Sequence, residues 1–273
     1  MGWWISQPNS VYADPGKILR MFTEGTNPAE FYNSKLGMAW ISAENRLTIN
    51  DVLMGCGQDV MAVRDPGACA AGVDVGRLLH VVIGFKPHEK TFQVCHIASV
   101  SSFNDLADLC KRFNVKAAVC DIEPETRQVR QFQADSRFPV WLCDYQEHTS
   151  HTGVQWSEDS GIVRVNRTEM LDTVHDYFSS GKVTLPLRCS AVEDYAKELT
   201  NVAKVSKEDQ VTGSKEFRYV RIGPDHFAHA TAYALLSTKR IGTVSTYHEN
   251  YQHRVKAQID FDPHTHDQDM SEF

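Results

Sequence analysis

The 273-residue sequence has no apolar stretch that approaches the roughly 20 residues a helix needs to cross a bilayer. Its first residues also lack the basic and apolar regions of a secretory signal peptide. Both absences favour an intracellular protein without a membrane anchor. The hydrophobic content of 42% and the charged content of 23% are ordinary for a globular chain, and this length supplies ample material for a core.

Paired cysteines are also missing, although the sequence contains seven cysteines. None forms a Cys-x-x-Cys motif, and most lie within apolar segments. An odd number of cysteines in such positions argues against a disulfide framework and against a structural zinc site. We therefore expect reduced cysteines in the core.

Basic charge is scarce, since the formal net charge is −7. This balance argues weakly against nucleic-acid binding, so any affinity for DNA would have to come from local basic patches. The sequence also contains no Gly-x-x-x-x-Gly-Lys-Ser/Thr phosphate loop. ATP-driven movement of a substrate is therefore not predicted for this chain.

Three aspartates stand at the edges of apolar segments that are far apart in the chain. Asp74 lies in Ala-Gly-Val-Asp-Val-Gly, Asp121 ends the run Ala-Ala-Val-Cys-Asp, and Asp225 precedes an alanine-rich segment. Burial of an unpaired carboxylate costs several kcal/mol, so a shared cation would explain all three positions. Structural alternatives remain open, because Asp121 also suits a turn and Asp225 also suits a helix cap.

Apolar periodicity predicts an α/β fold. The expected strands cover 69–75, 78–85, 91–100, 115–122 and 140–143, with helices over 102–113 and from Pro124 to about Ser136. Further helices are expected over 167–180, 191–202 and 225–236, and hairpins over 153–165 and 211–222. This β-β-β-α-β-α-β order places Asp121 at the carboxyl end of a crossover strand, where open α/β sheets position ligands.

Carboxylates that converge in this way suit two-metal phosphodiester hydrolysis. Two ions about 3.5–4 Å apart would activate a water and stabilise the leaving oxygen. Mg²⁺ and Mn²⁺ prefer such oxygen ligands. The sequence therefore predicts a metal-dependent nuclease in which Asp74, Asp121 and Asp225 hold Mg²⁺ or Mn²⁺, with two ions expected.

Residues beside the aspartates are candidates for assisting roles. Glu123 could orient water, and His226 and His229 could approach the scissile phosphate or shuttle protons. The structural alternatives are a solvated loop for the glutamate and satisfied structural roles for the histidines.

Two groups of basic residues are candidates for contacts with DNA phosphates. Arg127 and Arg130 recur along one expected helix, where an ordinary solvated face is an equal alternative. Lys215 and Arg218 flank the second expected hairpin. Contacts of this kind bind DNA without reading its sequence.

Six segments, in this order, resemble the nuclease domain of tailed-bacteriophage terminase large subunits: residues 2–7, 30–37, 72–76, 119–126, 165–172 and 223–230. The resemblance implies an RNase H-like mixed β-sheet with helices on both faces and additional hairpins. It also implies that the three aspartates bind metal and cut concatemeric viral DNA during genome packaging. The implied partners are double-stranded DNA, the portal protein and the small terminase subunit, in the host-cell cytoplasm.

Such large subunits normally also carry a packaging ATPase domain, which this sequence lacks. We therefore expect either the nuclease part of a longer protein or a shortened protein. The expected parts are an interdomain packing segment over 1–68, the nuclease domain over 69–240 and a polar tail over 241–273. The alternatives are another RNase H-like nuclease, such as a resolvase or an RNA-strand hydrolase, and a non-catalytic module that docks on DNA or a portal.

Overall fold

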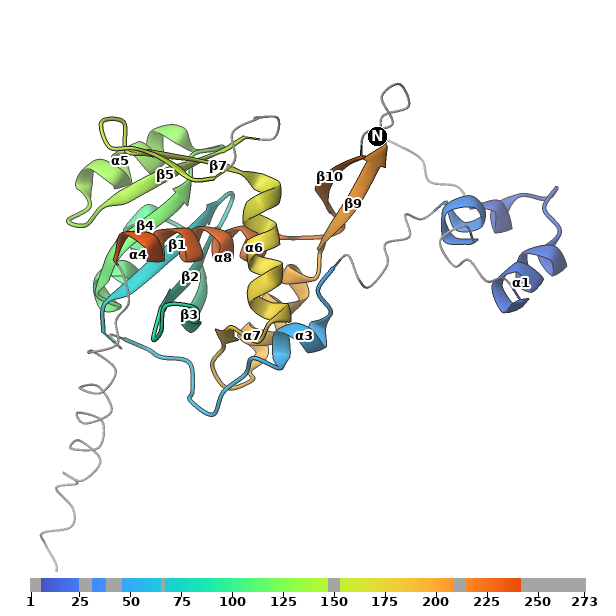
Figure 1. Ribbon diagram of the computed structural model, residues 1–273, viewed down its shortest axis with the longest axis horizontal. Coiled ribbons are helices and arrows are strands. Elements are labelled where there is room, and N and C mark those ends of the chain that lie inside the picture. The colour runs from blue at the N-terminus through green and yellow to red at the C-terminus, as the bar shows by residue number, and fades with distance from the viewer. Residues whose placement is uncertain are drawn as a thin grey trace, which may run out of the picture.

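The computed structural model describes residues 6–24, 31–37, 46–64, 67–146, 153–208 and 215–241 (Figure 1). Its centre is a mixed sheet whose first strands are β1 (Cys69–Val75), β2 (Leu79–Phe85), β3 (Phe92–Val100), β4 (Val115–Asp121) and β5 (Val140–Gln146). The first three strands form an antiparallel meander. β4 pairs in parallel with β1, and β5 pairs in parallel with β4.

The crossovers between these strands are helical, as the sequence predicts. The two helices are α4 (Phe103–Arg112) and α5 (Thr126–Asp135). α4 begins where expected, because the Ser102 side chain accepts a hydrogen bond of 3.1 Å from the Asp105 backbone amide. The strand order in the described sheet is β6-β7-β5-β4-β1-β2-β3-β8. This arrangement confirms the predicted RNase H-like fold, with its β-β-β-α-β-α-β order.

Additional strands extend the sheet at both edges. They are β6 (Gln155–Ser157), β7 (Ile162–Asn166) and β8 (Val183–Thr184). β6 and β7 form the hairpin that was predicted over 153–165, and β7 continues the sheet beside β5. β8 pairs with β3 at the opposite edge and was not predicted from the sequence, because it contains only two residues.

The second hairpin differs from the prediction. It consists of β9 (Val202–Glu208) and β10 (Lys215–Arg221), which pair along their full length, so the expected hairpin over 211–222 is wrong. The expected helix over 191–202 is α7 (Ser190–Leu199), which ends three residues earlier. Asn201 follows the helix, and its side-chain amide donates a hydrogen bond to the Pro224 carbonyl at 2.6 Å. The β-branched residues that follow then favour a strand.

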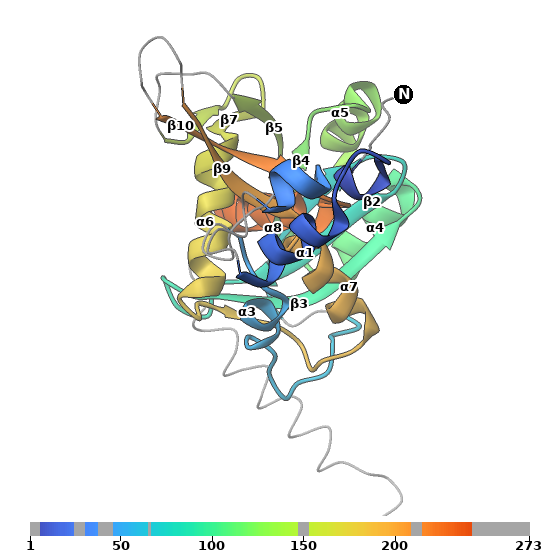
Figure 2. The ribbon, with the colours of Figure 1, turned by 90° about the vertical axis from the view of Figure 1, so that its right-hand side faces the viewer.

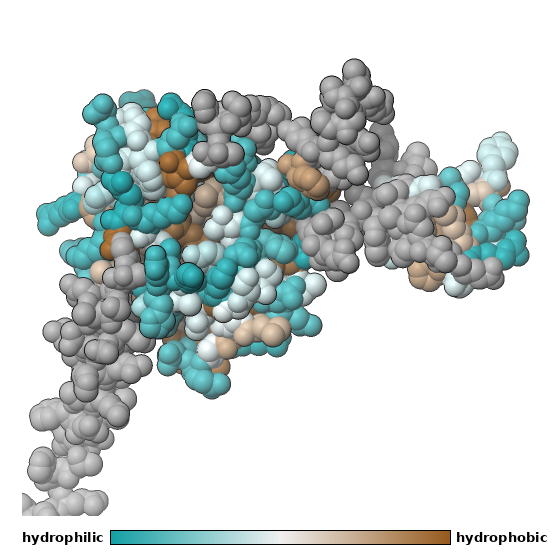
Figure 3. Space-filling model, in the orientation of Figure 1, coloured by the Kyte–Doolittle hydropathy of each residue, from teal (hydrophilic) through white to brown (hydrophobic). Residues whose placement is uncertain are grey.

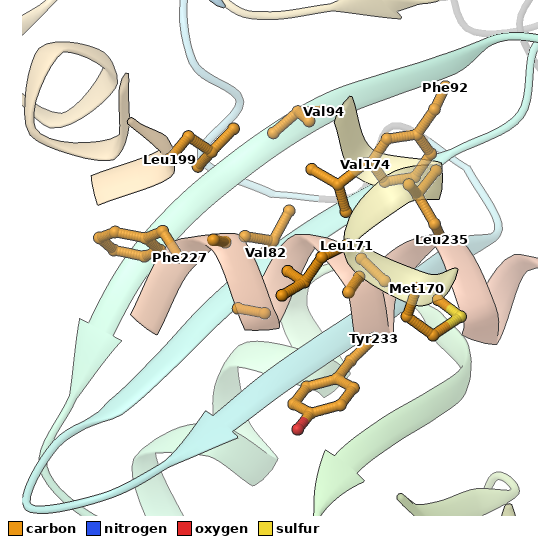
Figure 4. Packing of buried hydrophobic residues seen from close by; sticks show 14 of the residues in the cluster. Val82, Phe92, Val94, Met170, Leu171, Val174, Leu199, Phe227, Tyr233 and Leu235 are labelled. Carbon is orange, nitrogen blue, oxygen red and sulfur yellow. The ribbon is translucent and has the colours of Figure 1, made fainter. Parts of the chain in front are cut away.

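Helices cover both faces of the sheet, as expected. α6 (Arg167–Ser179), α7 and α8 (His226–Ser237) pack on one face. α4 and α5 pack on the other, and Figure 2 shows them on the side of the sheet opposite α6. Figure 4 shows the core of the first face, where Val82 of β2 lies near Leu171 of α6, and Leu235 of α8 belongs to the same cluster.

The backbone of α8 lies directly against that of β1. A side chain at Gly72 would overlap the backbone of Ala230 and Ala234 and would lie 2.7 Å from the Tyr233 carbonyl carbon. The helix backbone therefore rests on the strand itself, which only glycine allows. Because Asp74 lies two residues further along the same strand, it points toward the same helix.

Part of the chain that precedes the sheet packs against it. α3 (Ile49–Leu53) begins with a capping box between Thr48 and Asp51 and contacts α6 and α7. The described elements before it are η1 (Gln7–Asn9), α1 (Pro15–Glu24) and η2 (Tyr32–Leu36). Residues 242–273, which include most of the expected polar tail, lie outside the described residues.

Most of the cysteines lie in the core, as the sequence predicts. Five cysteines are buried, Cys56 is partly buried and Cys189 is exposed. Among the described residues, no helix combines the length and the apolar character that a membrane span requires. In the view of Figure 3, hydrophilic and intermediate residues predominate over the sheet-containing body, with hydrophobic residues scattered between them.

The contact at Gly72 predicts that Gly72→Ala destabilises the protein by at least about 2 kcal/mol, because the added methyl group has only backbone to displace. The measurement is the free energy of unfolding in urea. Gly76→Ala is the matched control, because its added methyl group meets Leu78 at an ordinary 3.6 Å, and it should cost less than about 1 kcal/mol. Equal effects of the two substitutions would contradict this account of the helix–strand contact.

Candidate active site

Two of the predicted aspartates lie side by side. β1 and β4 are parallel neighbours with Val73 opposite Cys120, and the next residue on each strand is Asp74 or Asp121. Both side chains therefore emerge at the carboxyl ends of adjacent strands, on the face covered by α8. Asp74 is buried and Asp121 is partly buried. The crossover topology thus creates a pair of close carboxylates.

The third aspartate stands at the start of α8, but its side chain does not cap the helix. The backbone amide of Phe227 instead donates to the Glu198 carboxylate of α7 at 3.0 Å. The carboxylate of Asp225 is buried and is contacted by Arg221 at 3.2 Å and by His229 at 3.4 Å. A capping role therefore does not account for Asp225.

Asp74 has a histidine partner. Its carboxylate lies 2.8 Å from Nδ1 of His226, the first residue of α8. This hydrogen bond raises the pKa of His226, although burial acts in the opposite direction. The ring of His80 stacks on that of His226, with centroids 4.4 Å apart.

Asp121 is the carboxyl group whose charge is least favoured. Burial, together with the nearby charge of Asp74, raises the pKa of Asp121 to about 6. The backbone amide of Glu123 donates to the Asp121 carboxylate at 3.1 Å and partly offsets this effect. A bound cation would remove the electrostatic penalty, so this position suits a metal ligand.

Asp225 has the opposite electrostatic balance. Burial disfavours its charge, but the hydrogen bond from His229 and the positive charges of Arg221 and Arg167 outweigh that cost and lower the pKa of Asp225. The three aspartates therefore meet one face of the sheet with different partners: a histidine, a backbone amide, and a cluster of cations.

His229 connects the aspartates to a second polar group. Its Nδ1 lies 3.3 Å from the Tyr145 hydroxyl, and its Nε2 lies 3.4 Å from an Arg167 nitrogen. The hydroxyl of Tyr233 is buried beside this group and points out of the apolar cluster in Figure 4. His229 is thus held from both sides of its ring.

The β9–β10 hairpin is fixed beside this site by α6. Asp172 of α6 accepts hydrogen bonds from Lys204 and from the Tyr219 hydroxyl, both at 2.8 Å. Arg167 donates to the Tyr219 carbonyl at 3.1 Å. Arg218 is exposed on the same hairpin. Lys215 is the first residue of β10, but its side chain lies outside the described residues.

The remaining predicted residues are placed differently. Glu123 and Arg127 are exposed. Arg130 donates to the Ser160 carbonyl at 2.8 Å, so its guanidinium joins α5 to the β6–β7 turn. Asp144, which also lies near the end of a strand, faces away from α8 and pairs with Arg164 at 3.2 Å.

Sequence reasoning missed several side chains at this site: His80, Tyr145, Arg167, Glu198 and Tyr233. Only His80 had an available signal. The short turn between β1 and β2 places it directly opposite Asp74 in the antiparallel register. The others reach the site through tertiary packing, which no local spacing indicates.

The aspartates do not all converge on one point. Among the described residues, the three ionisable ligands whose donor atoms lie within 4.8 Å of one another are Asp74, His80 and His226. Asp121 and Asp225 lie outside that group, although the charge of Asp74 acts on Asp121.

The chain matches no protein family and no curated protein. Similar solved structures include the large terminase of a thermophilic bacteriophage, with 9% identity, a TM-score of 0.43, and coverage of 84% of this chain and 53% of the other. The large terminase nuclease of thermophilic phage G20c has 13% identity, a TM-score of 0.43, and coverage of 69% and 97%. The yeast mitochondrial Holliday junction resolvase Ydc2 has 10% identity, a TM-score of 0.31, and coverage of 78% and 88%. The chain thus spans about half the length of the first of these large terminases. Activity must be argued from the residues of the site.

The charge on Asp121 predicts a stabilising substitution. The pKa of Asp121 rises from an ordinary 3.8 to about 6, so the folded state loses stability as pH rises through that window. Asp121→Asn should therefore stabilise the metal-free protein by about 1–2 kcal/mol above pH 6, after solvent screening is allowed for, and by little at pH 4. Urea denaturation in chelator at both pH values measures the difference.

Asp144→Asn is the control for this experiment. It removes a carboxylate near another strand end on the opposite face, where an exposed ion pair contributes less than about 1 kcal/mol. A strong loss of stability in Asp121→Asn would instead assign Asp121 to a structural turn.

Proposed function

We propose that this protein is a divalent-metal-dependent endonuclease that cleaves double-stranded DNA. The observation that carries the proposal is the pair Asp74 and Asp121, which lie side by side at the ends of parallel strands. Asp225 stands at the start of α8, and its side chain makes no capping hydrogen bond to the helix. Such clustered carboxylates are costly in an isolated protein and useful when they bind cations.

In this proposal, Asp74, Asp121 and Asp225 would hold the divalent ions. Mg²⁺ or Mn²⁺ would supply activation of water and neutralisation of the phosphate charge. The hydrogen bond from His229 and the positive charges of Arg221 and Arg167 lower the pKa of Asp225 and keep its carboxylate ionised. His229, restrained by Tyr145 and Arg167, presents an imidazole within reach of the same carboxylate.

The substrate class follows from the β9–β10 hairpin. The hairpin is anchored to α6 through Asp172 and presents Arg218 to solvent. Arg221 at its end lies against Asp225, so the hairpin adjoins the carboxylates. A basic ribbon in this position would contact phosphates and guide a nucleic-acid backbone to the site without reading bases.

The biological setting we propose is cleavage of concatemeric viral DNA during genome packaging. It rests on the six ordered segments that resemble terminase nuclease domains. In that setting the protein would act in the host-cell cytoplasm with a portal protein and a small terminase subunit. The packaging ATPase would reside in a longer form of the chain or in a partner.

Plasmid nicking with Mg²⁺ or Mn²⁺ tests the activity. Asp74→Asn and Asp121→Asn should each lower the cleavage rate at least about 100-fold, because each removes an ion ligand. Asp144→Asn, near a strand end on the other face, should cleave like the wild type. Equal cleavage by all four proteins would reject the proposed site, and no metal-dependent cleavage by the wild type would favour a docking module.

Substrate choice separates the related nucleases. Plain duplex, branched DNA and an RNA–DNA hybrid are compared at equal concentration with the same protein and metal. The packaging proposal requires efficient cleavage of plain duplex. A strong preference for the branched substrate would indicate a resolvase, and a preference for the hybrid would indicate an RNA-strand hydrolase.

The hairpin predicts a salt-dependent contribution to DNA binding. Arg218→Ala should weaken binding of unrelated duplexes to a similar extent and should lower the salt-dependence slope by about one phosphate contact. Arg188→Ala, which removes an exposed arginine paired with Glu193 near α7, is the control and should leave both quantities unchanged. Fluorescence anisotropy across a salt series measures them. An unchanged slope in Arg218→Ala would exclude this residue from the DNA interface.

A further inference from the structure

Beside the carboxylates lies a second group of ligands that contains nitrogen. One donor atom each from Asp74, His80 and His226 lies within 4.8 Å of the other two. The three residues come from three elements: Asp74 from β1, His80 directly opposite it on β2, and His226 from the first turn of α8. The fold therefore assembles this group independently of Asp121 and Asp225.

We propose that Asp74, His80 and His226 form a binding site for a transition-metal ion such as Zn²⁺, distinct from the all-aspartate site for Mg²⁺ or Mn²⁺. Two imidazoles and one carboxylate are the ligands that Zn²⁺ commonly uses, whereas Mg²⁺ selects oxygen. The site shares Asp74 with the proposed nuclease centre, but its existence does not require the protein to cleave DNA.

The distances suit one ion. Zinc–ligand bonds of about 2.0–2.2 Å place two ligands of the same ion at most about 4.4 Å apart. The separation of 2.8 Å between Nδ1 of His226 and the Asp74 carboxylate already lies within that limit. The donor atoms of the whole group lie within 4.8 Å of one another, slightly beyond that limit.

The orientation of His80 defines the change that metal binding requires. The rings of His80 and His226 are stacked with planes 7° apart, so their in-plane lone pairs run parallel. One imidazole must turn out of the stack for both to meet one ion. Nδ1 of His80 is buried and makes no hydrogen bond of ordinary geometry among the described residues, although the nearby Leu78 backbone acts on this ring.

The surroundings favour a bound cation. Glu198 acts electrostatically on both imidazoles while it accepts the Phe227 amide at 3.0 Å. The negative charge of Glu198 therefore adds to that of Asp74 in favouring a bound cation. His226 is one-third exposed at its side chain, which gives an ion a path from solvent.

Calorimetry with ZnCl₂ tests the site on the full chain. Cysteines, histidines and carboxylates elsewhere contribute equally to every variant. His80→Gln and His226→Gln should each weaken one zinc-binding event at least about tenfold. His88→Gln, an identical substitution at an exposed turn, is the control and should bind zinc like the wild type.

A zinc-soaked crystal provides the second measurement. The proposal requires an anomalous peak in contact with Asp74, His80 and His226, together with loss of the parallel imidazole stack. Zinc affinity in His80→Gln equal to that of the wild type, or a peak without His80, would overturn the three-ligand site. Plasmid cleavage by His80→Gln with Mg²⁺ is scored separately, so failure of the zinc site is distinguishable from failure of the proposed nuclease.

Discussion

The direct contact between the backbone of α8 and β1 at Gly72 organises the site. A helix can lie this close to a strand only where side chains are absent or small, and Ala230 and Ala234 meet the glycine from the helix. The contact fixes the first turn of α8 over the ends of β1 and β4. Asp225 and His226 therefore reach the neighbourhood of Asp74 although about 150 residues of sequence separate them. Without this packing, the chain would hold a close carboxylate pair but no third carboxylate near it.

Charge is the second organising principle, and the fold distributes it unevenly. Asp74 is balanced by His226, and Asp225 is balanced by Arg221 and His229. Asp121 has mainly a backbone amide to offset its burial and the neighbouring charge. The fold therefore satisfies two of its carboxylates with nearby histidine and arginine side chains and leaves the third electrostatically strained. That imbalance is the strongest physical reason to expect an added cation at this point.

Local pattern predicted most of the fold because the central strands are short apolar runs with clear turns between them. The crossover order then placed Asp74 and Asp121 on neighbouring strands, which the parallel register shows. The second hairpin was misjudged because Val202 fits both the end of an amphipathic helix and the start of a strand. The side chain of Asn201, which reaches across to Pro224, separates the two elements, and a long-range contact of this kind leaves no trace in local periodicity.

The sequence by itself determined the element order, the buried character of the strands and the positions of three isolated aspartates. These depend on local propensity and periodicity, which operate over a few residues. Only the tertiary structure decided that Glu198 receives the Phe227 amide in place of Asp225, and that His80 and His226 stack beside Asp74. The direct contact of α8 with Gly72 created these neighbours, because packing joins residues whose separation in the chain carries no signal.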